Sequence, residues 1–239
     1  MASPRKGSGK AMKTAAVEAQ KQHFSLKKIS PLTRNQERAF QEYSKGNNIV
    51  MSGCAGTGKS FLAMYLALND LLQDKSYYNR IVIIRSAVPS RDLGFVPGTL
   101  EEKSKIYQDP YIQIVNELVG RGDAWHFLLH KEIVQFQTTS FLRGLTFTDS
   151  ILFFDEFQSA TFHEIDTVLT RVGENCRFIL CGDYRQTDLN TKKESSGFGQ
   201  AVQILDRIDN TSHINFGMED VVRSGFVREY LMQKEKLGF

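Results

Sequence analysis

Residues 53–60 have the types and spacing needed to bind the phosphates of a nucleotide. They read Gly-Cys-Ala-Gly-Thr-Gly-Lys-Ser, the pattern G-x-x-x-x-G-K-[ST], and follow the apolar run 49–51 directly. The glycines let consecutive backbone N–H groups converge on a phosphate, and the N-terminus of the following helix adds positive potential. We expect Lys59 to reach the β- and γ-phosphates and the Ser60 hydroxyl to ligate Mg²⁺. The predicted phosphate-binding residues are Gly53, Cys54, Ala55, Gly56, Thr57, Gly58, Lys59 and Ser60.

Two acidic side chains close the apolar run 151–154. Asp155 and Glu156 follow it directly. A carboxylate at the end of a buried strand commonly accompanies such a glycine loop and holds Mg²⁺. We expect Asp155 to do this through water and Glu156 to orient and deprotonate a hydrolytic water. An apolar run ending in Asp-Glu also fits a helix N-cap, but its position downstream of the glycine loop favours the metal site.

A third polar cluster follows the apolar run 178–180. It comprises residues 182–186, Gly-Asp-Tyr-Arg-Gln. In a parallel sheet this segment would lie beside the other two, so that Gln186 could hydrogen-bond the attacking water or the γ-phosphate while Asp183 orients its neighbours. A turn without a catalytic role is the alternative for this segment taken alone.

The elements that must position these residues alternate along the chain. Apolar runs predict buried strands at 49–51, 81–84, 151–154 and 178–180, and alternating polarity predicts a half-exposed strand at 133–137. Helical patterns occupy the stretch from Thr33, then 60–72, a partly acidic stretch up to Val119, 162–171 and 219–236. This alternation predicts an α/β domain with a mostly parallel sheet, whose chemistry lies beyond the carboxyl ends of the strands.

Length and composition restrict the class of protein further. The 239 residues fit one large domain, and three cysteines, Cys54, Cys176 and Cys181, favour a reducing compartment over a disulfide framework. No apolar run approaches the ~18 residues that a membrane span needs. Residues 1–30 carry seven basic side chains and one acidic, a charge of +6, so the remaining 209 residues carry −3 of the overall +3. We interpret 1–30 as a basic, disordered tail, either solvated or an arm for phosphates, and 31–239 as the folded domain.

Two weaker signals favour structural interpretations. His126 and His130 are four residues apart, as metal ligands on a helix can be, but the sequence shows no third ligand near them. Trp125 lies among Phe127 and two leucines, which indicates packing or an interface anchor. We assign neither segment to chemistry.

The motifs occur together in one family. The chain resembles the PhoH-like ATPases, whose nucleotide domain is similar to the first RecA-like domain of superfamily 1 helicases. The resemblance covers residues 31–227 and rests, besides the glycine loop and the Asp-Glu pair, on segments 85–89, 92–98, 169–173, 182–186, 196–198 and 220–224. The family usually reads Asp-Glu-Ala-Gln after the acidic strand, whereas Phe157 precedes Gln158 here, and no recognisable accessory domain is attached.

The resemblance implies a RecA-like P-loop NTPase fold with three α/β/α layers, and hydrolysis of ATP with Mg²⁺. It implies that Gln36 reads the adenine edge, favouring ATP over GTP; an ordinary surface glutamine is the alternative. Helicases of this type bind ATP between two RecA-like domains, but a chain of this length holds one. A completing arginine would then come from another chain of a homo-oligomer, and the resemblance suggests a hexameric ring. Arg171 and Arg223 are the candidates, with surface salt bridges as their alternative role.

The same resemblance suggests single-stranded RNA or DNA as the substrate of mechanical work. Loop 89–98 with Arg91 and segment 141–144 with Arg143 lie where helicase-like domains contact a strand, and Phe95 would either stack a base or pack. We therefore expect a cytoplasmic Mg²⁺-dependent ATPase of a bacterium or a phage-infected host. The alternatives are an ATP-driven regulatory or assembly module that switches a protein partner, and a nuclease. The carboxylates available to a nuclease are Asp149, Asp155, Glu156 and Asp183.

Overall fold

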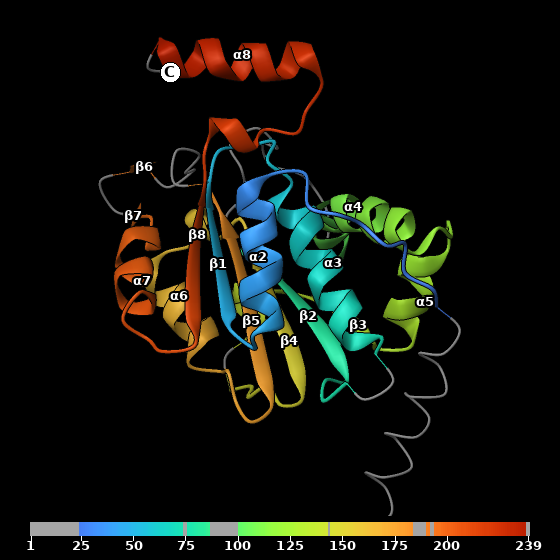
Figure 1. Ribbon diagram of the computed structural model, residues 1–239. Coiled ribbons are helices and arrows are strands. Elements are labelled where there is room, and N and C mark those ends of the chain that lie inside the picture. Colours follow the sequence, from blue (N-terminus) through green and yellow to red (C-terminus); the bar gives the residue numbers. More distant parts are fainter. Residues whose placement is uncertain are drawn as a thin grey trace, which may run out of the picture.

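A parallel sheet of six strands forms the centre of the molecule (Figure 1). The computed structural model describes residues 24–73, 76–86, 100–142, 144–183, 190–191 and 194–237. In spatial order the strands are β3 (Val134–Thr138), β2 (Arg80–Arg85), β4 (Ser150–Asp155), β5 (Cys176–Gly182), β1 (Asn48–Gly53) and β8 (Thr211–Phe216). Every neighbouring pair runs parallel. The predicted parallel sheet is confirmed, and all five predicted strands are present.

Helices cover both faces of this sheet, so the molecule has three layers (Figure 1). One face carries α2 (Arg34–Ser44), α3 (Lys59–Leu71), α4 (Leu100–Val119) and α5 (Ala124–His130), and the other carries α6 (Phe162–Leu169) and α7 (Phe198–Leu205). The short elements are η2 (Thr139–Phe141), η3 (Phe157–Ser159), η4 (Met218–Asp220) and the hairpin of β6 (Asn190–Thr191) and β7 (Glu194–Ser195). The predicted α/β/α layering of a RecA-like P-loop domain is confirmed.

Burial on both faces explains why the strands read as continuous apolar runs. In β2, Ile81 and Ile83 belong to the core under α2–α5, whereas Val82 and Ile84 belong to the core under α6 and α7. All four side chains are fully buried. Successive side chains of a strand point to opposite faces, so a strand covered on both sides must be apolar at every position.

β8 is a strand that the sequence does not predict. It pairs in parallel with β1 along its whole length, from Asn48 opposite Thr211 to Gly53 opposite Phe216. Only Ile214 and Phe216 of β8 are buried. Because β8 is an edge strand and its first three residues are polar, it lacks the apolar run that marks the central strands.

The C-terminal helix begins later than the sequence predicts. The pattern predicts a helix from residue 219, but residues 219–224 contain the end of η4 and a non-helical stretch, and α8 spans Gly225–Lys236. In that stretch the backbone N–H of Val222 donates to the Gly56 carbonyl at 3.1 Å, so the segment is bound to the glycine loop. α8 itself lies apart from the two helical layers (Figure 1).

The packed part of the chain begins before the predicted boundary at residue 31. Residues 24–33, the N-terminal strap, lie against α4 and α5: Phe24 is buried beside Phe127, with ring centroids 5.0 Å apart, and the Lys27 N–H donates to the Leu118 carbonyl at 2.8 Å. The adjacent lysines Lys27 and Lys28 make this segment look like part of the basic tail in the sequence. Residues 1–23 of that tail lie outside the described residues.

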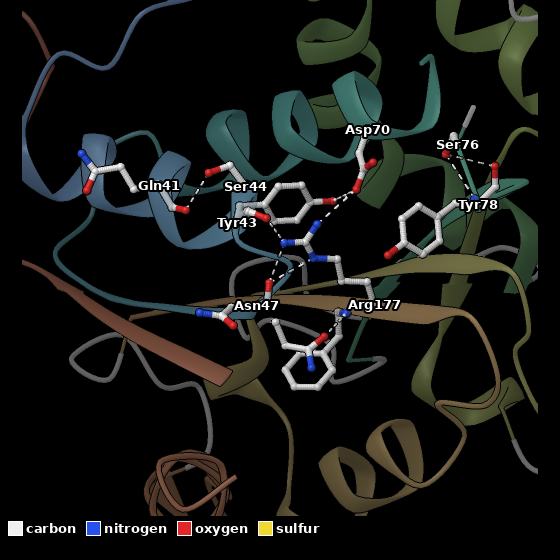
Figure 2. A network of polar contacts seen from close by, with 10 residues as sticks. Gln41, Tyr43, Ser44, Asn47, Asp70, Ser76, Tyr78 and Arg177 are labelled. Atoms are coloured by element: carbon white, nitrogen blue, oxygen red, sulfur yellow. Dashed lines mark hydrogen bonds and ion pairs between the residues drawn. The ribbon is translucent and has the colours of Figure 1, made fainter. Parts of the chain in front are cut away.

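Arg177 joins three elements at the edge where β5 begins (Figure 2). Its guanidinium lies 3.3 Å from the ring centroid of Tyr43 and donates to the Asp70 carboxylate at 3.1 Å. It also donates to the carbonyls of Asn47 and Tyr43, and the Tyr43 hydroxyl donates to the same carboxylate at 3.0 Å. The group ties α2, α3 and β5 together at the edge of the sheet opposite the glycine loop.

We expect Arg177→Ala to lower the free energy of unfolding by about 3 kcal/mol, because it leaves the half-buried Asp70 carboxylate and two backbone carbonyls without their shared donor. Urea denaturation measures the effect. Lys45→Ala is the control, because the Lys45–Glu42 pair is exposed on its lysine side and should contribute less than about 1 kcal/mol. Equal losses in the two variants would contradict this account of the network.

Candidate nucleotide and metal site

Gly53, where β1 passes into the glycine loop, is constrained sterically by the neighbouring strand β8. A Cβ on Gly53 would lie 2.0 Å from the carbonyl oxygen of Phe216 in β8, and the φ of Gly53 is +116°. Only glycine tolerates both conditions. The same carbonyl accepts a hydrogen bond from the Cys54 N–H at 3.0 Å. The unpredicted strand β8 therefore fixes the first residue of the loop.

Lys59 lies inside the loop that it follows. Its Nζ donates to the carbonyls of Gly53 at 2.8 Å and Cys54 at 2.7 Å, and the buried Thr57 hydroxyl donates to the Cys54 carbonyl at 3.0 Å. These bonds place the ammonium group at the mouth of the loop, above the N-terminus of α3. A cation and a helix N-terminus at one point form an anion-binding site.

Ser60 and Asp155 meet across the carboxyl edge of the sheet. The Ser60 hydroxyl, in the first turn of α3, donates to Asp155 Oδ1 at 2.9 Å, although β5 lies between β1, which leads into the loop, and β4, which ends in Asp155. Burial, together with the neighbouring Glu156 carboxylate, raises the pKa of Asp155 to about 6. Because burial and a neighbouring negative charge disfavour the ionised form of Asp155, a cation beside it would stabilise that form.

The donor set fits Mg²⁺ bound together with a nucleotide. A hydroxyl and one carboxylate are hard oxygen ligands, and Mg²⁺ usually retains waters and phosphate oxygens for its other positions. Within the described residues, no group of three or more His, Cys, Asp or Glu side chains could form an all-protein cage. Ser60 and Asp155 would hold such an ion, which would neutralise phosphate charge.

Glu156 is held by a residue that the sequence does not single out for chemistry. Gln158 Nε2 donates to Glu156 Oε2 at 2.5 Å, while Gln158 Oε1 accepts from the Asp183 N–H at 3.0 Å. Gln158 is 1% exposed, so its amide is a fixed bridge between the end of β4 and the end of β5. Glu156 has φ +52°, an unusual value for a non-glycine residue that is often found at functional sites.

The departure at Phe157 from the family pattern is a packing feature. Its ring is fully buried and stacks on Phe198 of α7, with centroids 4.6 Å apart. A Cβ on Gly182 would lie 2.9 Å from the Phe157 ring, so the larger side chain fills the space above a glycine. Phe157 therefore anchors the turn that presents Glu156 and Gln158.

A cavity of about 830 Å³, which is large enough for a nucleotide, is lined by Lys59, Ser60, Asp155 and Glu156. The strap contributes Ile29 and Leu32, and α4 contributes Gln113 and Glu117. Gln36 also lines it: its side chain is 7% exposed, accepts from the Leu32 N–H at 2.8 Å and donates to the Thr57 carbonyl at 3.1 Å. Gln36 is thus held against the glycine loop and is not an ordinary surface residue.

The two candidate arginines occupy different places. Arg223 lines the cavity of its own chain, and its Cγ lies 3.0 Å from where a Cβ on Gly56 would be. Arg171 follows α6, and its carbonyl accepts from the Phe147 N–H near the start of β4, at the opposite edge of the sheet. Arg171 is absent from the cavity lining, as judged from the described residues. Arg223 therefore lies beside the loop of its own chain, and the action of either arginine in a neighbouring chain stays a prediction.

Several predicted residues lie outside the described residues. They are Gln186, the loop 89–98 with Arg91 and Phe95, and Arg143. Of the neighbouring candidates, Asp183 is 5% exposed and lines the cavity, and Phe141 is 54% exposed.

Other clusters of reactive side chains do not form sites. Asp149 precedes β4, so it lies at the opposite edge of the sheet from the other carboxylates considered for a nuclease, which are Asp155, Glu156 and Asp183. His213 contacts Ser52 Oγ at 2.7 Å and Asp206 at 3.2 Å, the order of a serine-protease triad. Ser52 is only 2% exposed, which leaves a substrate no access to it. Trp125, fully buried, is a packing residue.

The family model described as "PhoH-like protein" matches residues 28–233. The chain belongs to the PhoH-like protein family. Among its relatives, a PhoH-like protein of Bacillus subtilis (strain 168) is 32% identical over 84% of this chain, and one of Mycobacterium leprae (strain TN) is 35% identical over 85%. This PhoH-like chain spans 62% and 57% of the lengths of those two relatives.

Solved structures similar to this PhoH-like domain include a helicase and a terminase. Pif1 helicase from Candida albicans has a TM-score of 0.38 at 18% identity, covering 79% of this chain and 40% of that one. The large terminase of a thermophilic bacteriophage, in complex with ADP, has a TM-score of 0.46 at 12% identity, covering 85% and 50%. Both scores are below 0.5, so the fold assignment rests on the sheet topology and the glycine loop.

We expect Gly53→Ala to abolish nucleotide binding and to lower the free energy of unfolding by more than about 1 kcal/mol, because its Cβ would collide with the Phe216 carbonyl. Titration with a fluorescent ADP analogue and urea denaturation measure the two effects. Gly199→Ala is the control, because nothing lies within 4 Å of its Cβ in α7, and it should leave binding unchanged. Unchanged affinity in the Gly53 variant would contradict the assignment of the loop.

Proposed function

We propose that this domain is a Mg²⁺-dependent ATPase that acts on single-stranded RNA or DNA as a homo-oligomer. The observation that carries the ATPase part is the meeting of Ser60 with Asp155, with Lys59 at the mouth of the loop and Glu156 beside the carboxylate. This arrangement supplies a phosphate site, metal ligands and a candidate base within one cavity. The family model and the relatives support the same class of protein.

The geometry suggests how hydrolysis would proceed. Lys59 and the loop N–H groups would hold the β- and γ-phosphates, and Mg²⁺ would neutralise charge on them. Glu156 would accept a proton from the attacking water, and the Gln158 bridge would hold its carboxylate in place. Gln186 stays a candidate for contacting that water or the γ-phosphate. Gln36, fixed beside the loop, would read the adenine edge and favour ATP.

The positions of the two arginines suggest different roles for them in an oligomer. Arg223 lies beside the glycine loop of its own chain, so it would contact the nucleotide in cis. Arg171 lies outside its own cavity and would have to enter that of another protomer, as a charge-stabilising finger worth ~10³–10⁵ in rate. A ring, hexameric as the family resemblance suggests, satisfies this requirement.

Exposed aromatic side chains at the carboxyl edge favour nucleic acid. Phe141, in η2 after β3, is 54% exposed, and Phe162, at the start of α6 after β4, is 36% exposed. η2 packs against α6, so the two aromatics belong to one region of the surface. Aromatic rings at the surface stack on bases without regard to sequence.

A regulatory or assembly module that switches a protein partner is the second candidate. The observation that favours it is α8, on which Phe226 is 81% exposed and Tyr230 is 60% exposed. One turn of helix separates these positions, so they share a face. Apolar side chains grouped on an exposed helix commonly mark a contact surface for protein.

None of the helices in the described part of the chain meets the length and apolarity needed to span a membrane.

We expect Glu156→Gln to lower kcat for ATP hydrolysis by about 10²–10⁴, because the amide cannot accept the proton of the attacking water. Nucleotide affinity should stay within a few-fold of wild type, whereas Lys59→Ala should lose it. Phosphate release and binding of a fluorescent ADP analogue measure these quantities.

In the same phosphate-release assay, single-stranded RNA or DNA should raise the rate of ATP hydrolysis by the wild-type protein. A lack of stimulation combined with a tightly bound protein partner would favour the switching module.

A mixing experiment separates the roles of the two arginines. We expect Lys59→Ala and Arg171→Ala to be inactive alone but partly active when mixed, because in a mixed oligomer an intact arginine can complete an intact loop. Lys59→Ala mixed with Arg223→Ala should stay inactive, since Arg223 acts in cis. The mass in solution of each of the two mixtures must show an oligomer. A strictly monomeric protein, or the opposite pattern of rescue, would contradict the assignment.

A further inference from the structure

A tyrosine from α4 contacts the Asp155 carboxylate at the oxygen that Ser60 does not contact. The hydroxyl of Tyr111 donates to Asp155 Oδ2 at 2.9 Å, while the Ser60 hydroxyl donates to Asp155 Oδ1 at 2.9 Å. Both oxygens of the carboxylate are therefore held, each by a hydroxyl from a different helix. Nothing in the sequence around Tyr111 marks it for this position.

The phenol ring of Tyr111 is fixed by other aromatic rings. It is 1% exposed and stacks on Trp125, with centroids 6.4 Å apart and an angle of 21°. Phe153 of β4 meets it edge-on at 6.0 Å, and Phe136 of β3 lies at 5.9 Å. Rings packed in this way have little rotational freedom. The hydroxyl is thus delivered to Asp155 by a rigid support.

The charges around the contact keep Tyr111 a donor and Asp155 an acceptor. Burial raises the pKa of Tyr111 well above its usual value, so the hydroxyl keeps its proton. Arg85, the last residue of β2, lies over the ring of Tyr107 at 5.5 Å and has the Asp155 and Glu156 carboxylates in its field. Burial opposes its charge, but Tyr111 and these carboxylates raise the pKa of Arg85 overall. A permanent cation thus balances the buried acidic groups.

Tyr111 and Ser60 differ in what a bound metal would demand of them. Ser60 is itself a proposed Mg²⁺ ligand, so its hydrogen bond to Asp155 must compete with the metal. The Tyr111 hydroxyl has no such second role and can keep the carboxylate oriented in both states. Hydrogen bonds from outside the ligand set commonly orient metal ligands, and their loss typically costs 10–100-fold in affinity.

We propose that Tyr111 is a positioning residue that orients the Asp155 carboxylate for the Mg²⁺ bound with the nucleotide. The inference rests on the proposed Mg²⁺-dependent binding of a nucleotide, and it adds α4 to the elements that build the site.

The test compares Tyr111→Phe with a matched variant, Tyr43→Phe. Both remove only a hydroxyl of a buried tyrosine, and both break a tyrosine–aspartate hydrogen bond, because Tyr43 donates to the half-buried Asp70 carboxylate at 3.0 Å. Tyr43 lies beside Arg177, at the edge of the sheet where β5 begins (Figure 2), whereas Asp155 lies at the other end of the strands, as the last residue of β4. Affinity for a fluorescent ADP analogue is measured as MgCl₂ is varied, and again in excess EDTA, alongside urea denaturation.

We expect Tyr111→Phe to raise the MgCl₂ concentration for half-maximal nucleotide binding by about tenfold or more. Its affinity for the analogue in EDTA should match wild type. Tyr43→Phe should keep the wild-type Mg²⁺ dependence, although the urea midpoints of both variants fall by similar amounts. Because the readout is binding, it supports or opposes the inference even if hydrolysis is undetectable.

Three results would overturn the inference. Identical Mg²⁺ dependence in wild type and Tyr111→Phe would do so while leaving the proposed ATPase intact. Equal weakening with and without Mg²⁺ would show that Tyr111 only supports the fold. Wild-type binding that does not respond to Mg²⁺ would remove both the positioning role and the proposed metal dependence.

Discussion

The hydrogen bond between Ser60 and Asp155 constrains the whole carboxyl edge of the sheet. Ser60 begins α3 after the loop from β1, and Asp155 ends β4; β5 lies between these two strands, so about 10 Å of sheet separates them. On the face that carries α3, the Ser60 hydroxyl reaches Asp155 over the end of β5. On the other face, Phe157 and Gln158 occupy the space over Gly182, the last residue of β5. The turn that carries Glu156 is therefore packed against the end of the same strand over which Ser60 and Asp155 meet.

Much of this arrangement could be predicted from the sequence, for a physical reason. A phosphate loop needs glycines followed by Lys-Ser, and central parallel strands must be apolar on both faces, so both leave strong local signals. The loop, Asp155 and the four central strands are all located in this way, and the alternating polarity of 133–137 locates the edge strand β3. The fold class follows from their alternation, because a parallel sheet requires a crossover between successive strands.

The features that escape prediction depend on contacts between distant segments. Tyr111 reads as one aromatic residue in a helix, and only the tertiary fold brings it to Asp155, 44 positions away. β8 meets the glycine loop through the backbone carbonyl of Phe216. Any residue type could supply that carbonyl, so the sequence gives no sign of the contact. The two lysines of the strap make it read as part of the basic tail, although Phe24 packs into the core. Arg223 lines the cavity, but sequence alone does not distinguish a cis from a trans position.

Trp125 gives the molecule a built-in optical probe. It is the one tryptophan in the chain, so its emission would not be mixed with that of another indole. Its ring stacks on Tyr111, and the hydroxyl of Tyr111 contacts Asp155, which places a fluorophore two contacts from the Asp155 carboxylate. The intrinsic fluorescence spectrum of the unlabelled protein thus samples the surroundings of that carboxylate, without a dye in the cavity.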